Sequence, residues 1–178
     1  MHKLTHQEIL IERSRNRDLE KLPVCLLLDN VRSLYNVGSL FRLADGARLE
    51  RILLTGITGT PPQPGLRKTA LGADAFVPWE YHVDGLKLAK RLSNEGYQLV
   101  VLEHVQSAKI HWDVPYQFPL CLVVGNEITG VREEIVKLAD QAIEVPMKGE
   151  KNSLNVAMAT GIVVYEIVRQ YAQLGTYS

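Results

Sequence analysis

Polar side chains gather in three loops that each follow a short apolar run. Asn36 and Arg42 follow the first run, Glu127 stands in a glycine-flanked loop, and Ser153 and Asn155 precede the last helical pattern. Amide, guanidinium and carboxylate groups can orient a substrate hydroxyl, bind a phosphate and stabilise negative charge that develops during a reaction. These three loops are therefore the first segments to consider for chemistry.

Each of these side chains also has a structural interpretation. Asn36, Ser153 and Asn155 could simply cap helices, because short polar side chains accept hydrogen bonds from the first backbone N–H groups of a helix. Glu127 could simply pair with Arg132, five residues further along the chain. No single one of these residues therefore indicates an active site; their joint occurrence in the three loops does.

The elements that must position these residues alternate between strand and helix. Short, nearly continuous apolar runs indicate buried strands at Val24–Leu28, Arg51–Thr55, Gln98–Leu102, Leu120–Val124 and Ala142–Val145. Helical patterns occur at Val37–Arg48, Gly85–Glu95, Arg132–Ala139 and Asn155–Tyr171. This alternation predicts an α/β fold with a mostly parallel sheet and helices on both faces. Ligands bind beyond the carboxyl ends of the strands in such sheets, which is where the three loops lie.

The 178 residues fit one compact domain with a short N-terminal extension. Thr5 to Glu20 is predicted to be a helix that Thr5 caps together with Glu8, three residues later. Pro23 ends this helix. We therefore predict a helical extension over residues 1–22 and a single domain over residues 23–178.

Two further segments are unusual. Gly56–Gly72 contains Pro61, Pro62 and Pro64 and is so rich in turn-forming residues that we predict a mobile flap on the substrate side, without a regular element. The last helix carries no charge from Asn155 through Tyr165, although a surface helix normally has a polar face. It is predicted to be covered on both sides, either by its own sheet and a second subunit or inside a monomer.

The overall charge excludes broad attraction to nucleic acid, because 20 basic residues balance 20 acidic ones. Residues 31–68 nevertheless contain six basic and two acidic residues, a local net charge of +4. This stretch is either a phosphate-facing surface or a group of ordinary solvated charges.

Cysteine usage and the absence of a long apolar segment indicate a cytoplasmic protein. Cys25 and Cys121 lie within apolar runs, as small buried side chains do in a reducing compartment. The N-terminus lacks the apolar core of a signal peptide, and no apolar stretch reaches the roughly 20 residues that span a bilayer. His82, His104 and His111 have no partners at metal-ligand spacing, so no metal site is predicted.

The three loops, in this order, resemble the three sequence motifs of the SpoU/TrmH-type RNA 2′-O-ribose methyltransferases of the SPOUT superfamily. The matching segments are Asn36–Gly46, Val123–Val131 and Ile143–Ala157, and the similarity extends over about Val24–Tyr171. A glycine-rich G-x-G-x-x-G or P-loop sequence does not follow the first strand, which disfavours the familiar dinucleotide and nucleoside triphosphate folds.

This resemblance implies S-adenosylmethionine-dependent methylation of a ribose 2′-hydroxyl in tRNA or rRNA. It also implies a trefoil knot in the C-terminal third and a homodimer packed through the last helix. By motif position, Asn36, Arg42, Glu127, Ser153 and Asn155 are expected to be catalytic. The positions expected to bind the cofactor are Leu102, Gly125, Val145, Met147, Ser153 and Leu154.

Several alternatives remain open at this stage. The chain could be a non-catalytic RNA- and cofactor-binding subunit, or it could methylate a base, as other branches of the superfamily do. The resemblance casts Arg42 as the base, yet a guanidinium is effectively always protonated in proteins and could instead act as a fixed charge. The RNA and its modified nucleotide, the need for an accessory protein and the role of the N-terminal helix are not specified.

Overall fold

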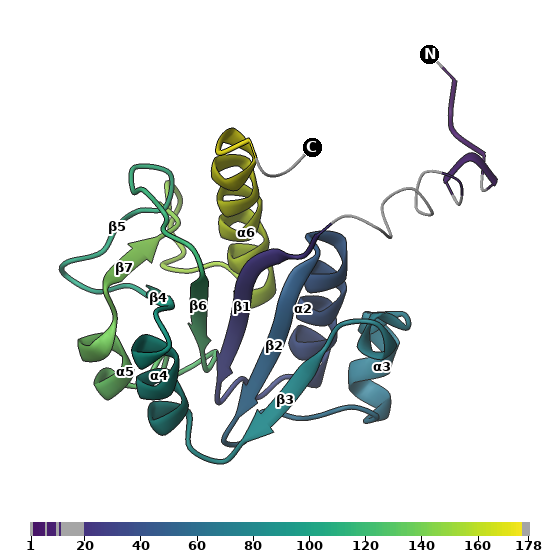
Figure 1. The fold of residues 1–178 in the computed structure, drawn as a ribbon. Helices are drawn as coiled ribbons and strands as arrows, with labels where there is room; N and C mark the ends of the chain where they lie inside the picture. Colours follow the sequence, from purple (N-terminus) through teal and green to yellow (C-terminus); the bar gives the residue numbers. More distant parts are fainter. Residues whose placement is uncertain (1, 6, 10, 12–19, 176–178) are drawn as a thin grey trace.

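The computed structural model describes residues 2–5, 7–9, 11 and 20–175 of the chain. These residues form one seven-stranded sheet of strand order β3-β2-β1-β6-β4-β7-β5, in which every pair of neighbours is parallel (Figure 1). The strands are β1 (Leu22–Asp29), β2 (Leu49–Thr55), β3 (Trp79–His82), β4 (Gln98–Leu102), β5 (Lys109–Ile110), β6 (Leu120–Gly125) and β7 (Gln141–Glu144). The predicted α/β class is confirmed.

Helices cover both faces of the sheet, as the sequence predicts (Figure 1). One face packs against α2 (Leu34–Gly46), α3 (Pro64–Ala70) and α6 (Val156–Gln173). The other face packs against α4 (Gly85–Asn94) and α5 (Glu133–Leu138). Alternate residues of β1 therefore belong to different apolar clusters, with Leu26 on the first face and Leu27 on the second.

All five predicted strands and all four helices predicted within the 23–178 domain are present, with ends that differ by a few residues. The sequence analysis misses β3 and β5, which form the two edges of the sheet. β3 is largely exposed and reads Trp-Glu-Tyr-His, and β5 has only two residues, so neither forms the apolar run of a buried strand. The knot implied by the resemblance stays a prediction.

The prediction that Gly56–Gly72 lacks a regular element is wrong over its second half, where α3 forms. Pro64 stands in the first turn of this helix, where a missing N–H costs nothing. Leu66 and Ala70 are buried against α2. Gly38 permits the close approach, because a Cβ at this position would lie 2.1 Å from the Leu66 carbonyl oxygen. Packing therefore orders a segment whose proline and glycine content suggested a loop.

At the N-terminus, the predicted capping of Thr5 and Glu8 is confirmed. The Glu8 N–H donates to Thr5 Oγ1, and the Thr5 N–H donates to Glu8 Oε2. Most of the helix predicted as far as Glu20 lies outside the described residues. Cys25 and Cys121 are buried free thiols, as predicted. No helix of the described part of the chain has the length and apolar character needed to cross a membrane.

Candidate active site

One asparagine side chain joins the three loops singled out in the sequence. The Asn36 Nδ2 group donates to Glu127 Oε1 at 2.7 Å, and Asn36 Oδ1 accepts from Asn155 Nδ2 at 2.9 Å. Glu127 is 91 residues from Asn36 along the chain, and Asn155 is 119 residues away. The fold thus brings one residue from each motif into a single hydrogen-bonded network.

The helix cap of α2 is Ser33 and not Asn36. The Ser33 side chain accepts from the Asn36 N–H at 3.3 Å, as an N-cap side chain does three residues before its donor. This leaves the Asn36 amide free to point toward Glu127 and Asn155. The purely structural interpretation of Asn36 as a cap is therefore wrong.

The Glu127 carboxylate accepts hydrogen bonds from three donors. The N–H groups of Arg32 and Ser33 donate to its two oxygens at 2.9 and 3.0 Å, in addition to the Asn36 amide. Partial desolvation acts to raise the pKa of Glu127, but these hydrogen bonds outweigh it, and the pKa lies below its usual value. Glu127 makes no ion pair with Arg132 within the described residues, so that structural interpretation is also wrong.

Asn155 has two roles at once. Its Oδ1 accepts from the N–H groups of Ala157 and Met158 at 3.0 and 3.4 Å, so it caps α6 as the structural interpretation proposed. Its Nδ2 group donates to Asn36 in the same geometry. The start of α6 is therefore fixed relative to the network.

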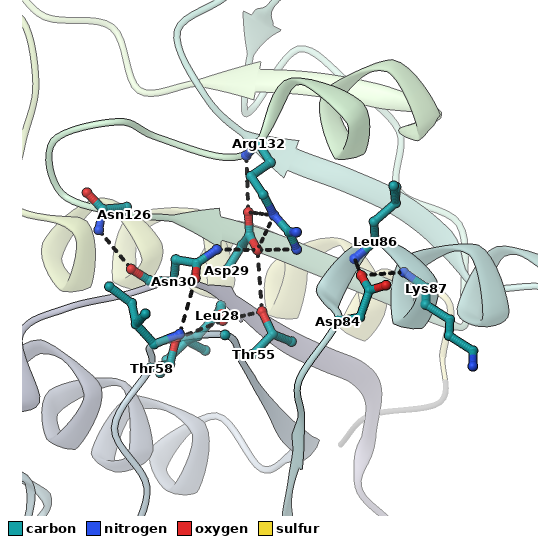
Figure 2. Close-up of polar contacts among 12 residues, drawn as sticks. Leu28, Asp29, Asn30, Thr55, Thr58, Asp84, Leu86, Lys87, Asn126 and Arg132 are labelled. Atoms are coloured by element: carbon teal, nitrogen blue, oxygen red, sulfur yellow. Dashed lines mark hydrogen bonds and ion pairs between the residues drawn. The ribbon is translucent and has the colours of Figure 1, made fainter.

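The sequence analysis missed a buried ion pair between Asp29 and Arg132 (Figure 2). Asp29, at the end of β1, is fully buried, and Arg132 Nη2 lies 2.8 Å from its Oδ1. The Arg132 N–H also donates to Asp29 Oδ2, and the Thr55 hydroxyl donates to Oδ1. A buried carboxylate needs such partners, because an unpaired buried charge is costly. The pair anchors the chain that leaves the Glu127 loop to the end of β1.

Two asparagines complete this anchoring. Asn126 Nδ2 donates to the Asn30 carbonyl at 2.9 Å, and Asn30 Oδ1 accepts from the Ile57 N–H at 3.1 Å (Figure 2). The loops that follow β1, β2 and β6 are thus tied together at the carboxyl edge of the sheet. The sequence signal for this cluster is the pair of polar residues at or directly after the ends of β1 and β6, Asp29-Asn30 and Asn126-Glu127.

A cavity of about 480 Å³ adjoins the network. It lies at the carboxyl ends of β4, β6 and β7 and at the start of α6, where ligands bind in parallel sheets. Of the residues predicted to bind the cofactor, those that line it are Leu102, Gly125, Val145, Ser153 and Leu154. Met147 is not among the lining residues, whereas Glu127 and Asn155 are.

Acidic side chains that the sequence analysis did not select also line this cavity. Glu103 and Glu144 follow or end β4 and β7, and His104 Nδ1 lies 2.6 Å from Glu144 Oε2. His104 thus lines the candidate site, although its sequence context suggested an ordinary surface or core histidine. The position of Glu103 and His104 directly after a strand was the signal that could have identified them.

Two glycines allow close packing of the loop that contains Glu127, at the wall of the cavity. A Cβ on Gly125 would lie 2.2 Å from the Val131 nitrogen. Gly130 has a φ of +71°, a left-handed conformation that favours glycine, and a Cβ there would lie 2.2 Å from Glu103 Oε2. Glu103 Oε2 accepts from the Val131 N–H at 2.7 Å, so the loop and the carboxylate are in direct contact.

Arg42 is not part of the network. Its side chain is exposed on α2 and makes no hydrogen bond or ion pair with the described residues. Within the basic stretch 31–68, Arg51 pairs with Glu50. Arg67 in turn lies 3.5 Å from Asp74. The basic residues of this stretch that form no ion pair with the described residues include Arg32, Arg42 and Lys68.

The described part of the chain contains no group of three or more histidine, cysteine, aspartate or glutamate side chains placed to hold a metal ion. The polar groups of the network and cavity include amides, carboxylates, the Ser153 hydroxyl and the His104 imidazole, and the Arg42 guanidinium lies outside the network on α2. This set can orient hydroxyl and phosphate groups and can complement a cation in the cavity.

The chain is similar in sequence to several proteins that are named as RNA 2′-O-methyltransferases. The chain is 31% identical to the tRNA (guanosine(18)-2′-O)-methyltransferase of Aquifex aeolicus, over 97% of this chain and 78% of that protein. It is 30% identical to a 23S rRNA (guanosine-2′-O-)-methyltransferase of a Burkholderia species, over 85% of this chain and 61% of that protein.

Solved structures show the same fold. The crystal structure of the A. aeolicus TrmH/SpoU tRNA modifying enzyme superposes with a TM-score of 0.84 at 30% identity, covering 96% of this chain and 86% of that one. An AdoMet-bound rRNA methyltransferase from Sinorhizobium meliloti superposes with a TM-score of 0.78 at 26% identity, covering 88% of this chain and 59% of that one. The model of the SpoU rRNA Methylase family matches residues 23–165. The chain belongs to this family.

Proposed function

We propose that the chain transfers a methyl group from S-adenosylmethionine to a ribose 2′-hydroxyl of tRNA or rRNA. The observation that carries this proposal is the network of Asn36, Glu127 and Asn155 beside a cavity at the carboxyl edge of the sheet. The names of the relatives support both the reaction and the substrate class. The buried free thiols Cys25 and Cys121 support a cytoplasmic location.

The cavity suits S-adenosylmethionine in size and in chemistry. About 480 Å³ lies within the range of small-molecule sites. Leu102, Val145 and Leu154 offer apolar contact to an adenine ring, and Glu103 and Glu144 offer negative charge to a cationic ligand. When bound, this cofactor supplies a methyl group activated by a positively charged sulfur.

The network has unused hydrogen-bonding capacity for a ribose. An asparagine amide carries two N–H donors and an oxygen with two lone pairs. Asn36 uses one donor and one lone pair in the network, which leaves one of each for ribose hydroxyl groups. Orienting the 2′-hydroxyl in line with the methyl group is a large part of what catalysis of this reaction requires.

Arg42 completes the site from the solvent side. In this proposal it acts as a fixed positive charge and not as a base. Such a charge binds the phosphate beside the target ribose. It also stabilises the alkoxide that develops as the hydroxyl proton passes to a solvent water molecule and the oxygen takes the methyl group, which releases S-adenosylhomocysteine. Because it makes no hydrogen bond or ion pair with the described residues, it is available for both tasks.

Substitution of Arg42 tests the proposed function. We expect Arg42→Ala to lower methyl transfer by about 100- to 1,000-fold, the usual cost of losing one charge-stabilising donor. Arg42→Lys should retain measurable turnover if the residue is a fixed charge. The assay is transfer of labelled methyl from S-adenosylmethionine to separate tRNA and rRNA pools from a strain lacking the protein, followed by digestion to nucleosides.

The nucleoside products separate the alternatives. Arg42-dependent 2′-O-methylnucleoside in one pool supports the proposal and identifies the substrate class. A labelled base would indicate base methylation, and no label despite cofactor binding would indicate a non-catalytic binding subunit. An Arg42→Lys variant as inactive as Arg42→Ala would contradict the fixed-charge role. Unfolding temperature is the control, because neither substitution removes a contact within the described structure.

Cofactor binding is tested at Gly130. We expect Gly130→Ala to weaken S-adenosylmethionine binding at least about tenfold, because a Cβ there would lie 2.2 Å from Glu103 Oε2 and would displace this cavity-lining carboxylate. Gly149→Ala is the matched control, since a Cβ there meets nothing within 4 Å. Isothermal titration calorimetry measures both affinities. Equal affinities for the two variants would count against this cavity as the cofactor site.

The last helix supports a homodimer. Met158, Ile162 and Tyr165 lie at helical spacing on α6 and are 62%, 43% and 55% exposed, while Val163 and Ile167 are buried against the sheet. A second copy that packs on this stripe would cover apolar surface that is otherwise in water. We expect the wild-type protein to sediment as a dimer and Ile162→Asp to sediment as a 20.0 kDa monomer. A monomeric wild type would contradict this arrangement.

A further inference from the structure

Tyr35 is an exposed aromatic residue next to the centre of the network. It precedes Asn36 in the first turn of α2 and is 53% exposed. Its hydroxyl group makes no hydrogen bond with the described residues, so the phenol oxygen does not hold the ring in place. An aromatic ring that neither packs into the core nor bonds through its hydroxyl is available to a ligand.

A cation lies over this ring. The ammonium of Lys68, on α3, is 6.0 Å from the centroid of the Tyr35 ring, and Lys68 makes no ion pair with the described residues. The position of α3 is well defined: the Thr69 hydroxyl donates to the Tyr35 carbonyl at 2.9 Å, and Gly38 allows backbone contact with Leu66. The ring and the cation are thus part of one packed unit.

Tyr35 lies on the same face of α2 as the proposed catalytic arginine, Arg42. Tyr35, Ser39 and Arg42 follow one another at intervals of four and three residues, which places them on one side of a helix. Seven residues separate Tyr35 from Arg42, so they are about 10.5 Å apart along the helix axis at 1.5 Å per residue. Asn36, one position beyond Tyr35, contacts the network.

We propose that Tyr35 and Lys68 form a stacking site for an unpaired RNA base next to the methylated nucleotide, an inference that rests on the proposed function. Proteins bind unpaired bases by stacking them on exposed aromatic rings and by placing cations against the neighbouring phosphates. The Tyr35 ring supplies the stacking surface. Lys68, over the ring, and Arg42, further along α2, supply positive charge that is not used in ion pairs with the described residues. The site selects an accessible, unpaired strand, because a base inside a duplex cannot reach the ring.

The test compares Tyr35→Leu with Tyr35→Phe, because leucine removes the aromatic face and phenylalanine keeps it. We expect Tyr35→Leu to raise the KM for RNA about 5- to 150-fold, the range for loss of one base–aromatic stack. Tyr35→Phe should restore most of the affinity. The RNA is total tRNA or total rRNA from a strain lacking the protein, and KM comes from labelled methyl transfer.

Lys68→Ala probes the cation by salt dependence. We expect it to weaken RNA binding and to reduce the slope of log Kd against log salt concentration by roughly one, the effect of losing one phosphate contact. Lys87→Ala, an exposed lysine on α4 at the other face of the sheet, is the matched control. Trp112→Ala is the matched control for Tyr35→Leu, because it removes another exposed aromatic side chain: Trp112 is 51% exposed in the loop after β5.

The outcomes separate this site from the proposed function. A wild type that neither binds nor methylates either RNA pool would overturn both. Arg42-dependent methylation with an unchanged KM in Tyr35→Leu would overturn only the stacking site. A Tyr35→Phe variant as impaired as Tyr35→Leu, or a loss of S-adenosylmethionine affinity in Tyr35→Leu, would also overturn it, because stacking requires neither the hydroxyl nor the cofactor cavity.

Discussion

The hydrogen bonds of the Asn36 amide are the interactions on which the rest of the site depends. One side of the amide donates to Glu127 and the other accepts from Asn155, so a single planar group sets the spacing of three loops. Each partner is itself fixed, Glu127 by the backbone N–H groups of Arg32 and Ser33, and Asn155 by the first turn of α6. A group whose neighbours are fixed in this way is preorganised, which is what lowers the cost of aligning a ribose hydroxyl for reaction.

The network also separates two halves of the site with different chemistry. On one side, the ends of β4, β6 and β7 form an acidic and apolar cavity suited to a cationic cofactor. On the other, α2 and α3 present Tyr35, Arg42 and Lys68, which suit the bases and phosphates of RNA. The buried pair of Asp29 and Arg132 holds the loops of both halves to the same edge of the sheet.

Much of this architecture was predictable from sequence because buried strands and amphipathic helices leave local patterns. Three elements were not predictable, because they lack those patterns: β3 is exposed, β5 has only two residues, and α3 lies in a proline-rich segment. Contacts were harder still. From sequence alone, Asn36 and Ser33 are equally good candidates for the N-cap of α2, because the first residue of the helix is not known. Glu127 is likewise the nearer candidate partner of Arg132, since it is five residues away, whereas the true partner, Asp29, is 103 residues away. The resemblance to the family motifs identified the network residues, but their hydrogen-bond partners became known only from the structure.

A double-mutant cycle for Asn36→Ala and Asn155→Asp tests the central claim most directly. Asn155→Asp keeps an oxygen to cap α6 but removes the donor to Asn36, so it breaks the network contact without removing the helix cap. With kcat/KM for RNA methylation as the measurement, residues that act as one unit are non-additive. The account predicts that Asn155→Asp lowers kcat/KM strongly in the wild type and by less than about threefold when Asn36→Ala is already present. Equal losses in both backgrounds would show that the two side chains act independently, and would contradict it.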